Sequence, residues 1–226
     1  MFRSILFLVG IWVTFAQSVV ARDNYAVLIG ASTYTNLDDR FWLVGPANDV
    51  ELVSTYLTTN PHIPFRHQNV TVLADGVEGA QPPTLAAIRN SMDKLAAKVG
   101  PGDFVYLHFS GHGTQAPAAS DQFELDGLDE LFLPVDIGPW NDTTGTVENA
   151  LVDDEIGQMI GALRSRGATV WAVFDSCHSG TLTRSVVDED VRLRRLAPSD
   201  LGIPASAARM RSFASGPESA LRNASA

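Results

Sequence analysis

The sequence predicts a three-layer α/β sandwich in which a mostly parallel central sheet carries helices on both faces. Two observations support this prediction. Short apolar runs rich in β-branched and aromatic residues recur along the chain, and segments with apolar residues at helical spacing separate them. This alternation is typical of parallel sheets, because a crossover between parallel strands needs a helix-length connection. The predicted domain covers residues 22–184 and is large enough to bury one full core.

Four of the apolar runs predict buried strands. Each is short, is dominated by aliphatic, β-branched or aromatic residues, and borders turn-forming residues. They cover residues 25–30, 70–73, 103–109 and 169–174. An irregular acidic stretch, residues 116–150, precedes the last of them, and residues 131–135 within it predict a further strand or hairpin.

Three amphipathic segments between these strands predict helices. Each begins at a residue whose side chain can cap a helix N-terminus and ends at a helix-breaking residue. These pairs are Asn48 and Pro61, Thr84 and Gly100, and Asp153 and Gly167.

The first 21 residues predict a targeting segment. Arg3 gives a positive start, residues 5–16 are apolar over the length of a signal peptide, and small residues up to Ala21 offer a cleavage site. A retained anchor is the competing interpretation, but the apolar run is short for a membrane span. We expect residues 1–21 to be a cleaved signal peptide, with a secreted or periplasmic location and no stable membrane anchor after cleavage.

The chain has a formal net charge of −10, which is unevenly distributed. Residues 22–177 carry 8 basic and 21 acidic side chains, a net charge of −13, whereas residues 178–226 carry seven Arg and five acidic side chains, a net charge of +2. An acidic body disfavours nucleic acid and favours cationic partners. We therefore expect a basic peptide or protein as substrate or ligand, and no organic cofactor.

Cys177 is the only cysteine of the chain, and it follows the last predicted strand. It can form no internal disulfide, so a free thiol remains. His112 follows the third predicted strand in the same way, within Ser110-Gly111-His112-Gly113. If the two strands are parallel neighbours, both side chains emerge at one edge of the sheet, where ligand sites of such sheets lie. A Cys–His dyad needs this arrangement.

A dyad of this kind has defined chemical roles. The thiol attacks a carbonyl as the thiolate, and His112 would accept its proton and later pass it to the leaving amine. The backbone N–H groups of Gly113 and Cys177 could stabilise the oxyanion that develops. The alternative is an inert buried cysteine, the usual fate of a lone thiol, but the second motif at a strand end favours the catalytic interpretation.

Two motifs, Ser110-Gly111-His112-Gly113-Thr114-Gln115 and Asp175-Ser176-Cys177-His178-Ser179-Gly180, resemble the paired motifs of metacaspases, which are caspase-like cysteine peptidases. Residues 45–49, 126–136 and 151–156 are similar to further segments of that family. The resemblance covers residues 24–184. It implies a caspase-type fold and cleavage of peptide bonds after Arg or Lys.

The resemblance also implies an acidic pocket for the basic side chain, with Asp49, Ser110 and Asp175 at the matching positions. Asp175 stands two residues before Cys177, so on an extended segment both side chains point the same way. A carboxylate there can grip a guanidinium through two hydrogen bonds. For Asp49, an equally good explanation is its place in the first turn of a helix. The chain departs from the family at Pro46, where Cys is frequent.

Many metacaspases need calcium, so the resemblance implies a calcium site. Asp153 and Asp154 match acidic positions used for it, and the acidic side chains of residues 126–130 could add oxygen ligands. The chain departs from the pattern at Arg184, where the family usually has Asp. A purely structural explanation is that Asp153 caps the third helix.

Residues 185–226 predict an Arg-rich, flexible C-terminal tail. An acidic pocket would hold its arginines, so we expect the tail to be the protein's own first substrate. The candidates are Arg192, Arg194, Arg195, Arg209 and Arg211.

The 49 residues after Cys177 show no convincing pair of buried strands, whereas caspase-type folds continue with two more. Either the chain is a large-subunit-like form, or a partner chain completes the sheet, or the sequence is truncated. Two functions follow from the sequence: a cysteine endopeptidase for basic peptides, or a non-catalytic caspase-like module that binds basic peptides or a partner.

Overall fold

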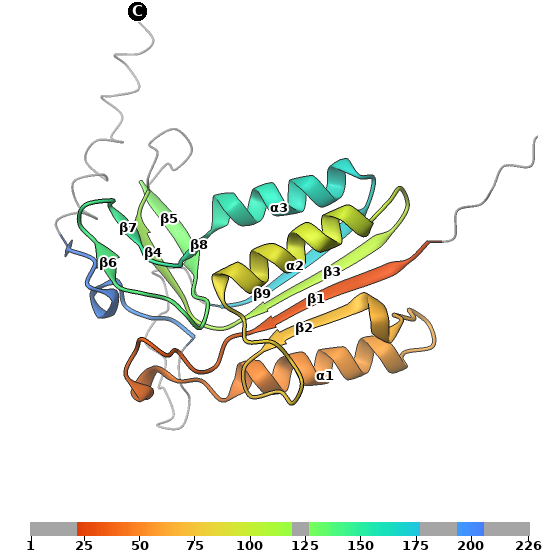
Figure 1. Cartoon of the computed structure of the whole chain (residues 1–226), viewed down its shortest axis with the longest axis horizontal. Coiled ribbons are helices and arrows are strands. Elements are labelled where there is room, and N and C mark those ends of the chain that lie inside the picture. Colours follow the sequence, from red (N-terminus) through yellow and green to blue (C-terminus); the bar gives the residue numbers. More distant parts are fainter. Residues whose placement is uncertain (1–21, 119–126, 177–193, 206–226) are drawn as a thin grey trace, which may run out of the picture.

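The computed structural model describes residues 22–118, 127–176 and 194–205. A four-stranded parallel sheet with the order β2-β1-β3-β9 lies at its centre. Helix α1 covers one face of this sheet, and helices α2 and α3 cover the other (Figure 1). The predicted three-layer α/β sandwich is confirmed. The elements are β1 (Asn24–Gly30), α1 (Gly45–Thr59), β2 (Val70–Ala74), α2 (Leu85–Lys98), β3 (Phe104–Ser110), α3 (Asp153–Ser165) and β9 (Thr169–Asp175).

The sheet separates two apolar cores. Val27 and Ile29 of β1 belong to the core beneath α2 and α3, whereas Ala26 and Leu28 belong to the core beneath α1. This division follows from the strand geometry, in which successive side chains point to opposite faces. All four side chains are at most 1% exposed, as expected for a central strand of a parallel sheet.

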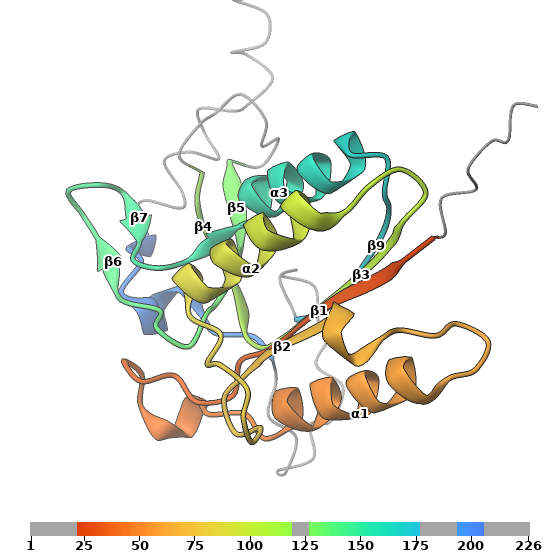
Figure 2. The same ribbon diagram turned by 45° about the vertical axis from the view of Figure 1, so that its right-hand side comes forward.

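A second, antiparallel sheet extends from the carboxyl end of β3 (Figure 2). It consists of β4 (Gly113–Pro117), β5 (Leu128–Phe132) and β8 (Leu151–Val152). The strand expected at residues 131–135 therefore exists but begins three residues earlier. Short elements complete the described chain: β6 (Trp140–Asn141), β7 (Thr146–Val147), and the 3-10 helices η1 (Asp39–Phe41), η2 (His67–Asn69) and η3 (Pro198–Leu201).

One of the three predicted helix caps is correct. The hydroxyl of Thr84 accepts a hydrogen bond from the amide of Ala87 at 3.1 Å. Helix α1 begins at Gly45, before Asn48, because Pro46 has a backbone pre-set for the first helical turn. Asp153 is the first residue of α3 and not its cap, because Val152 is held extended by its pairing with β5.

The segment 194–205 contradicts the prediction of a flexible tail for that part of the chain. Leu196, Leu201 and Ile203 are each at most 5% exposed and belong to the core beneath α2 and α3. Their spacing follows neither strand nor helix periodicity, so the pattern carried no signal of burial. The remainder of the predicted tail and the predicted signal peptide, residues 1–21, lie outside the described residues.

Within the described part of the chain, no helix is both long enough and apolar enough to cross a membrane.

Candidate active site

The two strands that precede the His and Cys motifs are parallel neighbours. In the register between β3 and β9, Ser110 lies opposite Asp175, and both are the last residues of their strands. The predicted adjacency of these strands is confirmed. Cys177 comes two residues after Asp175 and lies outside the described residues.

His112 is buried beside β3, with only 3% of its surface exposed. Its Nε2 atom lies 2.7 Å from the backbone carbonyl oxygen of Phe41. A carbonyl can only accept a hydrogen bond, so Nε2 carries the proton and Nδ1 keeps a free lone pair. Nδ1 is buried without a hydrogen-bond partner among the described residues. This tautomer suits a group that takes a proton from a neighbour.

Burial also keeps the His112 imidazole neutral. Removal from water lowers the pKa of His112 below its ordinary value, and the backbone groups of Phe41 and Arg194 oppose this shift only in part. A neutral imidazole at neutral pH is the form that a general base needs.

Tyr34 positions the backbone of His112. Its hydroxyl accepts a hydrogen bond from the His112 amide at 2.8 Å and donates one to the carbonyl of Ala31 at 3.2 Å. The Tyr34 and His112 rings pack with centroids 5.2 Å apart. Gly111 makes this approach possible, since a Cβ atom there would lie 3.1 Å from the Tyr34 hydroxyl.

The three residues predicted to form an acidic pocket lie together, and they surround the guanidinium of the chain's own Arg194. The Arg194 Nη2 atom lies 2.6 Å from Oδ2 of Asp49, and Nη1 lies 2.7 Å from Oγ of Ser110. Nη1 also donates to the carboxylate of Asp175. The Ser110 hydroxyl in turn donates to Asp49 at 2.9 Å. Three residues from α1, β3 and β9 thus converge on one guanidinium.

The close approach of α1 to the sheet brings Asp49 to this pocket. A Cβ atom at Gly30 would lie 2.6 Å from the carbonyl oxygen of Pro46, so only glycine lets the start of α1 pack against the end of β1. Gly45 forms part of the pocket wall, because a Cβ atom there would lie 2.5 Å from Nη2 of Arg194.

The backbone of residues 194–196 runs beside Gly113 of β4. The Gly113 amide donates to the carbonyl of Arg194 at 3.1 Å, and the Leu196 amide donates to the carbonyl of Gly113 at 3.0 Å. The Thr114 hydroxyl adds a bond to the carbonyl of Leu196 at 2.8 Å. The amide expected to bind an oxyanion therefore binds the carbonyl of the residue whose side chain fills the acidic pocket.

The acidic residues proposed for calcium are only partly gathered. Asp153 has a buried Oδ1 atom without a hydrogen-bond partner among the described residues. Burial and the nearby carboxylates of Glu130 and Asp154 raise the pKa of Asp153. Among described residues, no three His, Cys, Asp or Glu side chains form a metal-binding group. Asp126 and Arg184 lie outside these residues. A calcium ion at this place would need several oxygen ligands besides one from Asp153.

Sequence reasoning missed three contributors to the site. The carbonyl of Phe41 was missed because a backbone group leaves no side-chain signature. Tyr34 lies in a loop with no motif that marks it, and Gly45 was noted only as part of a resembling segment.

Comparisons with known proteins identify the family of the chain. Residues 24–185 match the family described as "Metacaspase, peptidase C14 domain". The chain belongs to the metacaspase family. It is 33% identical over 168 residues to Metacaspase-1 of Emericella nidulans, a match that covers 74% of this chain and 38% of that protein. It is 35% identical over 159 residues to Metacaspase-1 of Coccidioides immitis, covering 69% of this chain and 31% of that protein.

One solved structure has the same fold as this chain. The crystal structure of protein GSU0716 from Geobacter sulfurreducens superposes with a TM-score of 0.53 at 25% sequence identity. The match covers 90% of this chain and 66% of that one. The matched region of this chain spans less than two fifths of the length of each of the two fungal metacaspases named above.

Proposed function

We propose that the chain is a cysteine endopeptidase that cleaves peptide bonds after Arg or Lys through a dyad of His112 and Cys177. One observation carries the proposal. A guanidinium lies between Asp49, Ser110 and Asp175, while the carbonyl of the same residue accepts a hydrogen bond from Gly113. A substrate arginine bound in this way would present its scissile carbonyl at the edge of the sheet where Cys177 follows β9.

In the proposed reaction, Nδ1 of His112 takes the proton of the Cys177 thiol, while Nε2–H stays bonded to Phe41. The thiolate forms a bond to the scissile carbonyl carbon, and the oxygen gains the negative charge. The amides of Gly113 and Cys177 stabilise that oxyanion. The C–N bond then breaks, the leaving amine takes the proton from His112, and a thioester remains. Water, deprotonated by His112, attacks the thioester and releases the acid and the thiol.

The charge of the pocket explains the choice of substrate. Two carboxylates and a hydroxyl surround the guanidinium, and such groups hold Arg through charge-assisted hydrogen bonds. The ammonium group of Lys, which acts as a point charge, can bind to the same carboxylates. An Asp side chain would be repelled.

Reporter peptides test this function. Peptides that end in Arg, Lys or Asp before the reporter group should be compared with and without calcium, on the wild type and on Cys177→Ala and His112→Ala. We expect cleavage of the Arg and Lys peptides by the wild type, and loss of activity without loss of the folded state in both variants. Activity in Cys177→Ala or a preference for Asp would contradict the proposal.

Three further properties belong to the same proposal. Export through residues 1–21 would place the enzyme outside the cytoplasm, in a secreted or periplasmic location. Calcium would bind at Asp153, with Asp154 as a second acidic residue at the start of α3. The substrate would be a basic peptide or protein, and the negative charge of the body disfavours nucleic acid.

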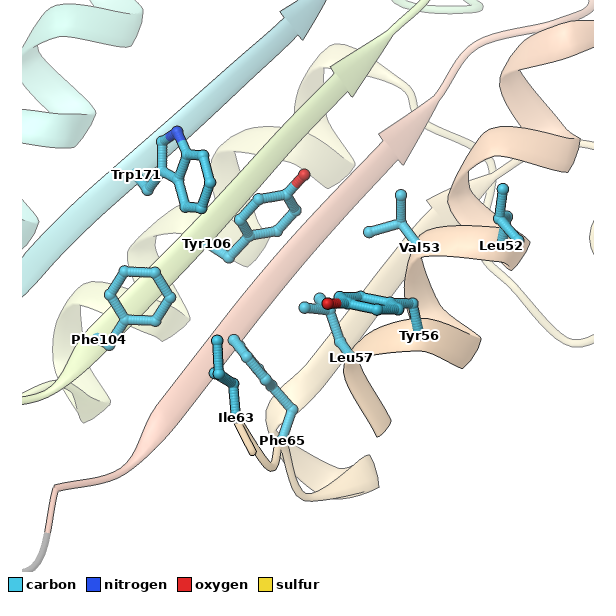
Figure 3. Close-up of a pocket in the computed structure, with 9 residues that line it drawn as sticks. All are labelled: Leu52, Val53, Tyr56, Leu57, Ile63, Phe65, Phe104, Tyr106 and Trp171. Carbon is cyan, nitrogen blue, oxygen red and sulfur yellow. The ribbon is translucent and has the colours of Figure 1, made fainter. Parts of the chain in front are cut away.

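An exposed apolar groove favours a second candidate function, the binding of a partner chain. The groove lies between α1 and the face of β3 and β9 (Figure 3) and has a volume of about 490 Å³. Leu52 is 71% exposed and Trp171 is 60% exposed, which is unusual for large apolar side chains on one face. The lining residues carry no charge: Leu52, Val53, Tyr56, Leu57, Ile63, Phe65, Phe104, Tyr106 and Trp171.

We propose that this partner contributes an amphipathic helix to the groove and a strand beside β9, which is an edge strand of the described sheet. The longer fungal metacaspases contain more polypeptide than this chain matches, which is consistent with such an addition. Light scattering on the purified protein distinguishes binding of a different partner from pairing of two copies of this chain. We expect a monomer if the partner is a different chain. A dimer of the purified protein that Trp171→Glu dissociates would identify the second copy instead.

A further inference from the structure

We infer that Asp75, the residue that follows β2, is a positioning residue for His112. This inference rests on the proposed function, because it concerns the general base of the proposed reaction. Asp75 acts through the loop of residues 31–43, which follows β1 and supplies two groups that hold His112. The carboxylate fixes the start of this loop, and the loop fixes the imidazole.

The sheet topology places Asp75 beside the start of the loop. Strands β1 and β2 are parallel, and Gly30 lies opposite Ala74, so the residues that follow them meet at one edge of the sheet. There, Oδ1 of Asp75 accepts a hydrogen bond from the Ser32 amide at 2.8 Å, and Oδ2 accepts one from the Thr33 amide at 2.6 Å. The Thr33 hydroxyl also donates to Oδ2. Hydrogen bonds to an ionised carboxylate are stronger than those between neutral groups, so Asp75 holds two consecutive residues firmly.

The two arms of the loop are bonded to each other. The Leu43 amide donates to the carbonyl of Ser32 at 2.8 Å, which closes the loop at its base. The Trp42 indole donates to the carbonyl of Tyr34 at 3.3 Å. Both Ser32 and Tyr34 are buried. The position that Asp75 gives to the first arm is therefore transmitted to the second arm.

Each arm of the loop contributes one partner of His112. The hydroxyl of Tyr34, next to Thr33, accepts a hydrogen bond from the His112 amide at 2.8 Å. The carbonyl of Phe41, two residues before Leu43, lies 2.7 Å from Nε2. This carbonyl decides that Nδ1 keeps the lone pair for the thiol proton. A catalytic group that is misplaced by about 1 Å can lose about 100-fold in rate, so the loop must be held accurately.

Asp103 offers a matched control at the opposite end of the sheet. Its carboxylate accepts hydrogen bonds from the amides of Asp23 and Gly100, both at 2.9 Å, just before β3 begins. Asp75→Asn and Asp103→Asn each keep the shape of the side chain but replace one acceptor oxygen with a donor. Both variants lose a carboxylate that holds two backbone amides, and only Asp75 is connected to His112.

An NMR titration of the His112 imidazole tests the inference without any need for activity. The full chain with Cys177→Ala is compared alone and combined with Asp75→Asn, Thr33→Val or Asp103→Asn. We expect the His112 midpoint to rise toward 6.5 in the Asp75 variant, because a loosened loop admits water to the buried imidazole. Thr33→Val, which removes one donor to Asp75, should cause a smaller rise, and Asp103→Asn should cause none.

The same titration can overturn the inference. An unchanged midpoint in the Asp75 and Thr33 variants, or an equal rise in the Asp103 variant, would show that Asp75 does not position His112. If Asp75→Asn does not fold, Thr33→Val decides the question by the same measurement.

Steady-state kinetics on Arg reporter peptides provide a second test. We expect kcat of Asp75→Asn to fall at least tenfold with KM little changed, and kcat of Asp103→Asn to stay near that of the wild type. The acid limb of the pH profile should move to higher pH in the Asp75 variant alone, because this limb reports the His112 pKa. A rise in KM with unchanged kcat would assign Asp75 to substrate binding and overturn the inference. Wild-type protein that cleaves no reporter would reject the proposed function, and the NMR titration would then decide the role of Asp75 alone.

Discussion

The Nη2 atom of Arg194 lies 2.6 Å from Oδ2 of Asp49, although the two residues are 145 positions apart in the chain. This contact assigns a role to Asp49 that its place in the first helical turn did not require. Of the two carboxylates that pair with Arg194, that of Asp49 is better shielded from solvent. The Asp49 side chain is 33% exposed, whereas that of Asp175 is 53% exposed. A more buried ion pair is less screened by solvent.

Asp49→Ala should therefore impair cleavage after Arg more than Asp175→Ala does. Loss of the better-buried partner leaves a guanidinium unpaired, and we expect kcat/KM to fall by about 100-fold, or about 3 kcal/mol. For Asp175→Ala we expect a loss of about tenfold. The measurement is steady-state kinetics on Arg reporters, with Glu51→Ala on the exposed side of α1 as the control. An equal loss in the Glu51 variant would point to net charge and not to the pocket.

Gly45→Ala should close the pocket without harming the fold. The added methyl group would lie 2.5 Å from the position of the Arg194 Nη2 atom, whereas the backbone of Gly45 is ordinary helix. The guanidinium must move away, so binding of acetyl-argininamide to the protein with Arg194→Ala should weaken by at least tenfold. Gly161→Ala, which meets open space in α3, is the matched control. Unchanged binding would show that the pocket wall lies elsewhere.

The sequence predicted the parts of this site that side-chain patterns encode. Apolar runs located β3 and β9, and polar residues at their ends located Ser110, His112 and Asp175. The carbonyl of Phe41 could not be predicted, since it depends on how a loop folds over the sheet. The burial of Leu201 was missed for a related reason: residues 194–203 are held by tertiary contacts and have little regular secondary structure of their own.

The two incorrect helix caps have a common cause. Asn48 and Asp153 are good capping residues, but local propensity was overruled by their neighbours. Pro46 lets α1 begin before Asn48, and the pairing of Val152 with β5 makes Val152 the extended residue before α3, so that Asp153 is already helical. Capping preferences of about 1 kcal/mol are small against strand pairing and core packing.

His112 should titrate below its ordinary pKa of 6.5, because burial disfavours the imidazolium. The unfolded chain binds this proton at the ordinary pKa and the folded chain only at lower pH. The stability contributed by neutral His112 is therefore complete above about pH 6.5 and is lost as the pH falls below that value. An NMR titration of the His112 imidazole signals measures the shift. A midpoint for His112 at or above its ordinary value of 6.5 would contradict this prediction.

Calcium should bind weakly, at millimolar concentrations, and should require Asp153. Its buried Oδ1 atom is an available acceptor, but the described acidic side chains provide too few oxygens for a tight site. Calorimetry of the wild type, of Asp153→Asn and of the exposed control Asp93→Asn measures this directly. Binding that survives in Asp153→Asn places the ion elsewhere, and micromolar affinity would reveal a larger ligand set.

The bond between Arg194 and Arg195 should be the protein's first cleavage site. The side chain of Arg194 fills the acidic pocket, and its carbonyl already accepts the hydrogen bond from Gly113. Among the arginines after Cys177, Arg194 is therefore the best presented. The alternative is that these arginines only neutralise the acidic body.

Intact-mass analysis after incubation with calcium, on the wild type and on Cys177→Ala, decides between these two explanations. We expect a break after Arg194 in the wild type alone. Burial of Leu196 and Leu201 should keep the two pieces together under native conditions and release them in denaturant. A chain that stays intact while the preparation cleaves reporter peptides, or one that is cut only after Arg209, would show that the bond after Arg194 is not the first cleavage site.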